Sequence, residues 1–247
     1  MNTYGTLAIL FVMTIMGLAF HEWGHLITAK HYHVKVDKFV IGFGPVIFKK
    51  KFHGTEYMIK AILAGGYCSI DSDEFNRLSL YKKIIIYIIG IINNLILAFG
   101  ELFICFMLAN PHKRVIDILF HTLLKFFSLI NEFAFAIPKT IVELFTSLGS
   151  MNMAQSYIEL GNLITQQTTI YMQIASLLVA AASLNIMIAL FNLIPFPGLD
   201  GGNIAIILVT KLQELTGKKI SYEKLHVINT IGFFALWLFT GYILFRI

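Results

Sequence analysis

The chain has 247 residues, of which 57% are hydrophobic and only 13% are charged. An average soluble domain has about 25% charged and 45–50% apolar residues, so this composition indicates an integral membrane protein. The length fits a single domain, 1–247. The formal net charge is +5, but basic and aromatic residues nowhere alternate in a run, so we expect no nucleic-acid partner. The two cysteines, Cys68 and Cys105, form neither a CxxC pair nor a disulfide framework.

Four segments are long and apolar enough to span a membrane, which takes about 20 largely apolar residues. They are 5–29, 84–109, 174–195 and 227–245. Lysine and arginine indicate their orientation: ten lie between residues 30 and 83, four between 110 and 173, and four between 201 and 226. Because cytoplasmic loops carry the excess of basic residues, we expect a multi-pass protein of the cell membrane with the first and third loops in the cytoplasm and both termini outside it.

The segment 34–70 is not expected to span the membrane, because five glycines and Pro45 interrupt it. Within it, 46–49 and 55–63 predict two strands joined by a turn at His53-Gly54. Since this β-hairpin follows the first span directly, we expect it to be membrane-associated and to pack against the end of that helix. A cytoplasmic hairpin without a role in substrate binding is the alternative.

The segment 110–173 is apolar but is interrupted by charged and polar residues, which predicts amphipathic helices lying at the outer membrane interface. A further span over about 115–137 is the alternative. The fold class expected is therefore an all-α polytopic membrane protein with about four transmembrane helices, a membrane-associated β-hairpin after the first, and amphipathic helices in the outer loop.

The first predicted span contains His21-Glu-Trp-Gly-His25. Residues four apart lie on one face of a helix, so His21 and His25 can bind one metal ion together, with Glu22 beside them to act on a water molecule. This is the HExxH pattern of zinc hydrolases. Three ionisable groups in an apolar membrane helix are costly and mark a functional site, which disfavours the alternative of two ordinary core histidines.

A catalytic zinc site typically uses three protein ligands and keeps one position open. Asp200 is the best third candidate, because it follows a proline-containing helix break at the same membrane depth as the two histidines. An aspartate in a Pro-Gly turn more often only forms the turn, and Glu101, toward the outer half of the second span, is the rival carboxylate. We expect one Zn²⁺ per chain, bound by His21, His25 and Asp200, with Glu22 as the catalytic base.

The sequence HEWGH in the first span, with NLIPFPGLDGG at 192–202, resembles the site-2 protease family of intramembrane zinc metalloproteases. Residues 42–45 and 55–67 look like the glycine-rich β-hairpin of that family. Residues 90–94 resemble its GPxxN element, with Ile91 in place of the usual proline. The resemblance extends over nearly the whole chain, and its two metal motifs together are highly specific.

The resemblance implies an intramembrane zinc metalloendopeptidase that cleaves transmembrane segments of small membrane proteins or peptide precursors near the cytoplasmic side. Its partners would be the lipid bilayer and a transmembrane protein or peptide substrate. The resemblance also implies that Asn94 and Asn192 help to position the substrate or stabilise the oxyanion, although a helix–helix hydrogen bond is an equal alternative for each. Gly65 and Gly66, in the hairpin, are further candidates for substrate binding. The PDZ and CBS domains of other members are not expected here.

Two other functions stay open at this point. One is a membrane metal-binding or transport protein with a non-catalytic HExxH site, and the other is a membrane-anchored zincin that acts on soluble peptides. Glu22 disfavours the first, because transport needs no base between the two histidines. The expected burial of His21 within the helix disfavours the second.

Overall fold

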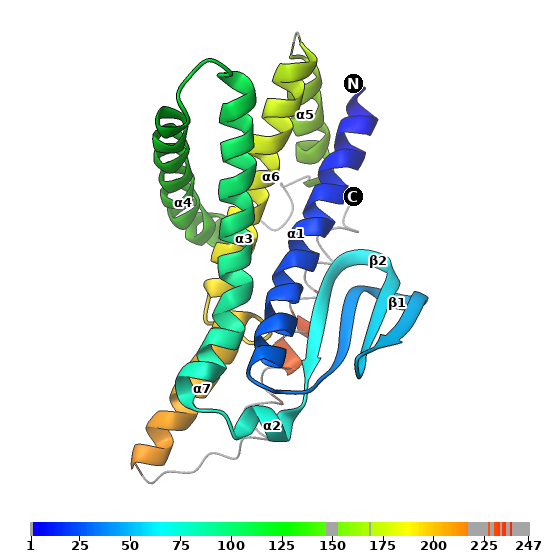
Figure 1. The fold of residues 1–247 in the computed structure, drawn as a ribbon, viewed down its shortest axis with the longest axis vertical. Helices are drawn as coiled ribbons and strands as arrows, with labels where there is room; N and C mark the ends of the chain where they lie inside the picture. Colours follow the sequence, from blue (N-terminus) through cyan, green and yellow to red (C-terminus); the bar gives the residue numbers. More distant parts are fainter. Residues whose placement is uncertain are drawn as a thin grey trace. The chain divides into compact units, whose positions relative to one another are not determined.

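The structure is a computed structural model, and it describes residues 2–146, 153–167 and 169–216 together with positions 227, 230–232, 234, 235 and 238. The described elements, in chain order, are α1 (Thr3–His31), β1 (Val36–Phe52), β2 (Thr55–Ile70), α2 (Ser72–Asn76), α3 (Leu80–Ala109), α4 (Val115–Thr146), α5 (Met153–Thr165), α6 (Ile170–Leu193) and α7 (Asp200–Thr216) (Figure 1). The mostly helical fold class with a small sheet after the first helix is confirmed.

Four helices of the described part are long and apolar enough to cross a membrane: α1, α3, α6 and the portion Val115–Lys139 of α4. The predicted spans 5–29, 84–109 and 174–195 correspond to α1, α3 and α6, with ends that differ by a few residues. The fourth predicted span, 227–245, lies almost wholly outside the described residues. Within 110–173 the structure has α4 and α5, and α4 fits the alternative of a further span.

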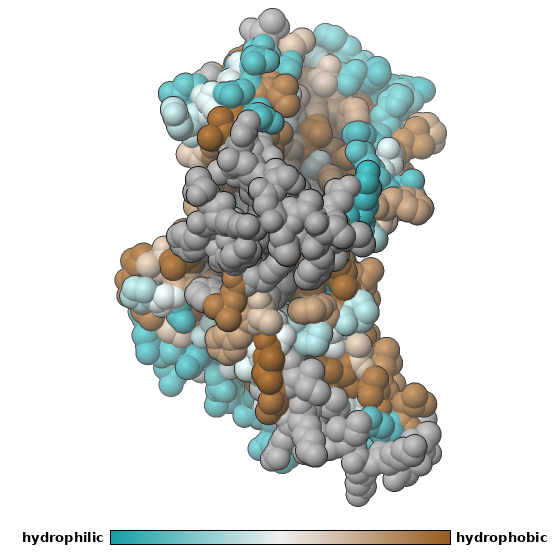
Figure 2. All heavy atoms as spheres, turned by 180° about the vertical axis from the view of Figure 1, so that it is seen from behind, coloured by the Kyte–Doolittle hydropathy of each residue, from teal (hydrophilic) through white to brown (hydrophobic). Residues whose placement is uncertain are grey.

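Many large apolar side chains are exposed on these helices. Phe11, Met16, Ile96, Phe127 and Phe135 are all more than half exposed. Figure 2 shows hydrophobic residues, in brown, at several places on the face that it presents. A water-soluble monomer rarely leaves so much contiguous apolar surface uncovered. The exposed residues are therefore the lipid-facing surface of a multi-pass membrane protein.

The chain forms two compact units. The first comprises residues 2–14 and the described residues of 95–191, and the second comprises residues 15–94 and the described residues of 192–238. The first unit has two apolar clusters, one around Leu102 and Ile186 and the other around Leu10 and Leu177. In the second unit, the C-terminal half of α1 packs through Leu26 and Ala29 against Val36 and Phe39 of β1 and Ile86 of α3.

The predicted β-hairpin is present, with its turn at His53-Gly54, but its strands are much longer than expected. The antiparallel register runs from Phe52 opposite Thr55 at the turn to Val36 opposite Ile70 at the other end. The middle is irregular, and Gly42 has a φ of 89°, which a residue with a side chain rarely adopts. This bend folds the hairpin on itself, so that the first part of β1 lies between two parts of β2.

The folded hairpin lies beside the C-terminal half of α1 (Figure 1). Phe39 illustrates its double pairing, because this residue of β1 has both Tyr57 and Cys68 of β2 as partners. The expectation that the hairpin packs against the end of the first span is therefore met by the structure. This packing brings β2 next to the helix that carries the HExxH sequence.

Candidate metal centre

The two histidines of the HExxH sequence lie one turn apart on the buried face of α1. His21 and His25 are each only 5% exposed, and their ring centroids are 4.8 Å apart. The helix places them together because residues four apart share one face. Trp23, between them in sequence, lies on the other face and is 45% exposed.

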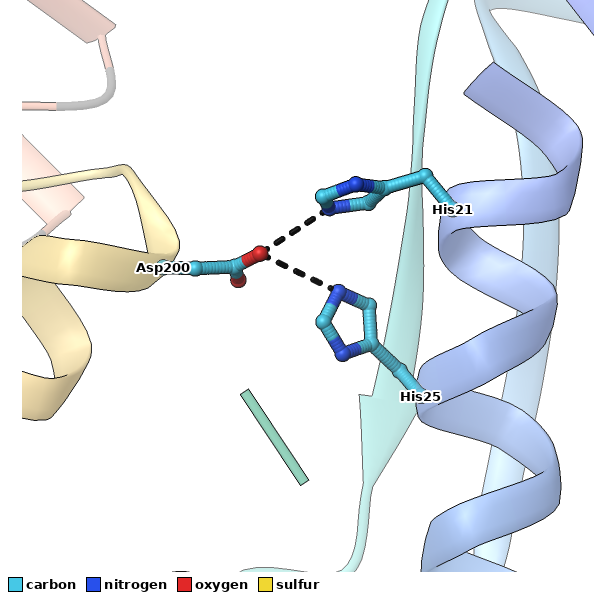
Figure 3. Close-up of side chains that lie close together, drawn as sticks. All are labelled: His21, His25 and Asp200. Atoms are coloured by element: carbon cyan, nitrogen blue, oxygen red, sulfur yellow. Dashed lines mark ion pairs between the residues drawn. The ribbon is translucent and has the colours of Figure 1, made fainter. Parts of the chain in front are cut away.

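Asp200 is brought to the same point by the first turn of α7, in the same unit as the histidines. Its Oδ2 atom lies 2.9 Å from His21 Nε2 and 3.3 Å from His25 Nε2, as Figure 3 shows. Asp200 is 9% exposed, and its carboxylate points toward the two rings rather than into solvent. One ligand atom from each of the three residues lies within 4.8 Å of the other two, so the set could hold a metal ion.

The hydrogen bonding of His25 indicates what kind of group belongs between these side chains. His25 Nδ1 lies 2.6 Å from the carbonyl oxygen of Ile86, which can only accept, so Nδ1 carries the proton. When the ring is neutral, as it must be to bind a metal, the lone pair of Nε2 therefore points toward Asp200. Asp200 Oδ2 in turn has no hydrogen-bond donor of suitable geometry among the described residues. Two buried acceptors therefore face each other, which a cation between them would stabilise.

The donor set fits zinc in particular. Imidazole nitrogen and carboxylate oxygen bind Zn²⁺ at about 2.0–2.2 Å, and two such ligands at a tetrahedral angle lie about 3.3 Å apart. The distances from Asp200 Oδ2 to the two ring nitrogens, 2.9 and 3.3 Å, are close to that value. The Ile86 carbonyl also provides the supporting hydrogen bond that metal-binding histidines usually make through their other nitrogen.

Asp200 and Cys68 differ in charge state. Burial alone would raise the pKa of Asp200, but the positive charge that His25 and His21 carry when protonated lowers it to well below its usual range. A metal cation in their place acts in the same direction, so the carboxylate is charged in both cases. Burial raises the pKa of the Cys68 thiol strongly, and the negative charge of Glu22 raises it further. Cys68 therefore stays a protonated thiol, and only a thiolate binds metal well.

Glu22 is placed against the hairpin. The backbone of Cys68 in β2 lies next to the Glu22 carboxylate. Gly66 allows this contact, because a Cβ atom at that position would lie 3.3 Å from Glu22 Cγ and 2.6 Å from the carbonyl oxygen of Val40. The carboxylate of Glu22 is thus fixed beside the two histidines by the strand that packs on α1.

Two residues of the segment 90–94, which were not among the candidate site residues, also shape the site. Gly90 of α3 lies directly against the histidines, because a Cβ atom there would be 2.6 Å from His25 Nε2 and 2.7 Å from His21 Nε2. Asn93, one turn further along α3, donates from Nδ2 to the carbonyl oxygen of Phe20 at 2.8 Å. The sequence around Gly90 carried a signal, since an apolar helix has little reason to contain glycine except close packing.

The remaining candidates are placed as follows. Asn94 is completely buried, and neither polar atom of its amide has a hydrogen-bond partner among the described residues. Asn192 is half-buried near the end of α6. Gly65 packs against the ring of Phe43 rather than against Glu22. Glu101, the rival third ligand, is not with the histidines but in the other unit, where it accepts a hydrogen bond from Asn185.

Comparison with known proteins gives a match to the sequence model of peptidase family M50 over residues 8–239. A protein of Borreliella burgdorferi named "Putative zinc metalloprotease" is 37% identical over 114 residues, which is 39% of this chain and 25% of that protein. One of Campylobacter jejuni with a similar name is 36% identical over 106 residues, 36% of this chain and 29% of that protein. These two matches thus cover under a third of each relative.

One relative is matched over most of its length. The protein of Clostridium perfringens named "Putative zinc metalloprotease CPE1693" is 24% identical over 305 aligned positions, which include 87% of this chain and 90% of that protein.

Proposed function

Because this chain belongs to peptidase family M50, the site-2 protease family of zinc metalloproteases, we propose that it hydrolyses peptide bonds in or next to the transmembrane segments of its substrates. The observation that carries the proposal is the convergence of His21, His25 and Asp200 on one buried point, with Glu22 fixed beside it. The histidines lie on a helix that is long and apolar enough to cross the membrane, so a substrate must reach them within or close to the bilayer.

His21, His25 and Asp200 would bind one zinc ion. Such an ion supplies a Lewis acid that makes water a nucleophile at neutral pH and polarises the carbonyl under attack. Glu22 would accept the proton of the attacking water and then deliver it to the nitrogen of the leaving peptide. The close packing of Gly66 against the Glu22 side chain would keep the carboxylate in position for both transfers.

The hairpin is the part of the chain best suited to hold the substrate. A transmembrane helix hides its carbonyl groups in its own hydrogen bonds, so the helix must unwind locally before it can be cleaved. The unwound peptide would then pair with a strand edge, as extended peptides do in β-augmentation. The contact of Gly66 with Glu22 places β2 next to the proposed base. Asn94 and Asn192 are further candidates for positioning the substrate.

Membrane orientation completes the proposal. The ten basic residues between residues 30 and 83 favour a cytoplasmic position for this loop, and His25 lies less than two turns from the end of α1 that enters it. Cleavage would therefore take place near the cytoplasmic side. Small membrane proteins and membrane-bound peptide precursors are the substrate class that fits such a site.

The decisive test is Glu22→Gln in the full chain, purified in detergent and supplied with zinc. We expect about one zinc ion per chain in both wild type and variant, because Glu22 is not among the proposed ligands. We expect cleavage of a model transmembrane peptide to stop in the variant, because an amide cannot accept the proton. The readouts are metal analysis and mass spectrometry of the products.

Glu132→Gln, on α4, is the matched control and should leave both measurements unchanged. Zinc binding without any cleavage of membrane peptides by the wild type would favour a non-catalytic metal-binding protein. Cleavage of soluble peptides alone would favour a membrane-anchored protease with an exposed site. Normal turnover in Glu22→Gln would mean that another group is the base.

A further inference from the structure

The far part of the hairpin exposes an unusual set of side chains. We call residues 46–62, which include the turn and both strand segments next to it, the outer hairpin. Its large apolar side chains are 40–71% exposed: Val46, Ile47, Phe48, Phe52, Ile59 and Ile62. The three consecutive lysines Lys49, Lys50 and Lys51 lie in the same strand and are also exposed. A surface this apolar and this basic is typical of a segment that contacts a membrane interface.

The positive charge of the outer hairpin is only partly neutralised. Lys49 forms an ion pair of 2.6 Å with Glu56, and this lysine holds the pKa of Glu56 below its usual value. Neither Lys50 nor Lys51 forms an ion pair within the part of the chain that the structure describes. Lys51 lies opposite Glu56 in the register and helps to lower its pKa, but it is not held in an ion pair. The ammonium groups of Lys50 and Lys51 can therefore both contact an anionic partner.

The strand register places the lysines at the level of the basic end of α1. Lys50 lies opposite Tyr57, whose hydroxyl oxygen is 3.4 Å from the Nζ atom of Lys30. Lys30 belongs to the last turn of α1, where a membrane helix reaches the headgroup region. Lysine and tyrosine together are the residues expected at that level, because each has an apolar body and a polar tip.

The same register places the apolar residues deeper. Ile41 pairs with both Gly66 and Ile59, and Gly66 contacts Glu22 of α1. Ile59 and its other partner, Phe48, are therefore level with Glu22. Glu22 precedes Lys30 by eight residues, which is about 12 Å along a helix axis. The outer hairpin thus changes from basic at the headgroup level to apolar at acyl-chain depth.

One lysine lies on the apolar side of this boundary. Lys60 is half-buried, and its Nζ atom lies 5.6 Å from the ring centroid of Tyr67. That contact with an aromatic face compensates part of the cost of placing an ammonium group there. Lys60 therefore has its contact within the sheet, and we do not assign it a role in binding lipid.

We propose that the outer hairpin is a binding surface for anionic phospholipid, with Lys50 and Lys51 on the headgroup phosphates and Val46, Ile47 and Phe48 among the acyl chains. Charge complementarity and the depth order of the side chains carry this assignment. Basic residues next to a membrane surface attract anionic lipid. The surface would fix the height of the sheet, and with it the position of β2 beside α1. The proposal does not depend on whether the chain is a protease.

The test uses the full chain with Phe48→Trp as a fluorescent reporter, reconstituted in phosphatidylcholine vesicles. Brominated phosphatidylglycerol or brominated phosphatidylcholine is added at the same mole fraction, and the quenching of the reporter is compared. The signal of the chain without the reporter, which contains Trp23 and Trp237, is subtracted. We expect stronger quenching by phosphatidylglycerol, because the lysines recruit that lipid to the reporter.

The charge variant is Lys50→Gln with Lys51→Gln, and it should remove the preference. Each lysine near an anionic surface changes binding by roughly fivefold, so the pair should lower the relative association constant for phosphatidylglycerol by roughly 5- to 25-fold at low salt. Lys49 is kept because it holds Glu56 in the sheet. Lys113→Gln with Lys211→Gln removes the same charge elsewhere and should keep the preference. Lys50→Arg with Lys51→Arg should also keep it, which shows that the fold tolerates changes there.

Three results would overturn the proposal. Equal quenching by both lipids would mean that the outer hairpin touches the bilayer without selecting a headgroup. Absence of quenching by either lipid would mean that the hairpin faces water or a protein, such as a second copy of the chain. Loss of the preference in the arginine variant would mean that the glutamine variant had changed the structure rather than the charge.

Discussion

Among the described residues, Asp200 in one unit and Glu101 in the other are the carboxylates that are less than a tenth exposed, and their surroundings differ. Asp200 and Glu101 are 9% and 7% exposed. The Asp200 carboxylate faces two imidazole nitrogens, and His25 presents a lone pair to it whenever its ring is neutral. Glu101 Oε2 instead accepts a hydrogen bond of 3.0 Å from Asn185 Nδ2, which is a true donor.

The comparison teaches when a buried carboxylate marks a metal site. An acceptor that meets a donor is satisfied by the protein itself, and the Glu101–Asn185 pair can serve simply as a contact between α3 and α6. An acceptor that meets other acceptors is stable only with a cation between them. The arrangement around Asp200 is of the second kind.

The largest effect is expected from neutralising the two carboxylates in turn. Asp200→Asn removes the negative charge of the third proposed zinc ligand. Zinc affinity should fall by more than the roughly 10- to 100-fold that loss of a contact supporting a ligand costs. Glu101→Gln makes the same change in the other unit and should leave zinc affinity at the wild-type value. The measurement is competition with a chelator of known affinity, followed by metal analysis of the purified chain.

The opposite pattern would exchange the roles of the two residues. If Glu101→Gln lost zinc while Asp200→Asn retained it, the third ligand would have to be sought in the first unit. If both variants retained zinc, the third ligand of the ion would be neither Asp200 nor Glu101.

A smaller effect is expected from adding one methyl group to α3. Gly90→Ala places a Cβ atom 2.6 Å from His25 Nε2, so the histidine rings must move away from their present positions. We expect zinc affinity to fall by about 10- to 100-fold, as for other changes that disturb the orientation of a ligand. Gly100→Ala on the same helix is the matched control, because a Cβ atom there has no neighbour within 4 Å. Equal zinc affinity in both variants would show that the helices separate easily.

The sequence predicted the local features of the site but not all of its neighbours. The HExxH spacing predicted that His21 and His25 share one face, since that depends only on helix periodicity. The placement of Asp200 required a match in membrane depth between two helices, which the apolar segments supplied. The hydrogen bond from His25 to Ile86 could not be predicted, because a backbone carbonyl carries no sequence signal.

The hairpin shows where local rules fail. The turn at His53-Gly54 follows from turn chemistry and was predicted, whereas the strands were predicted several residues too short. The reason is the bend at Gly42, which was interpreted as an interruption but lets β1 continue in a new direction. The contact of Gly66 with Glu22 depends on that bend, so it could not be derived from the sequence.

The smallest effect concerns the satisfied pair, and it tests whether Glu101 is more than a helix contact. Glu101→Gln keeps a group that can accept from Asn185 and should change the free energy of unfolding little. Asn185→Leu removes the donor and leaves the buried Glu101 carboxylate without it. Hydrogen bonds between membrane helices contribute about 0.6 kcal/mol on average and at most about 1.7 kcal/mol, so the loss should lie in that range. Unfolding in mixed detergent measures this loss of stability, with zinc content as the second readout.

Zinc content should stay at the wild-type value in both variants, since a contact that only joins α3 to α6 has no part in holding the ion. A fall in zinc with Asn185→Leu would instead connect the two buried carboxylates.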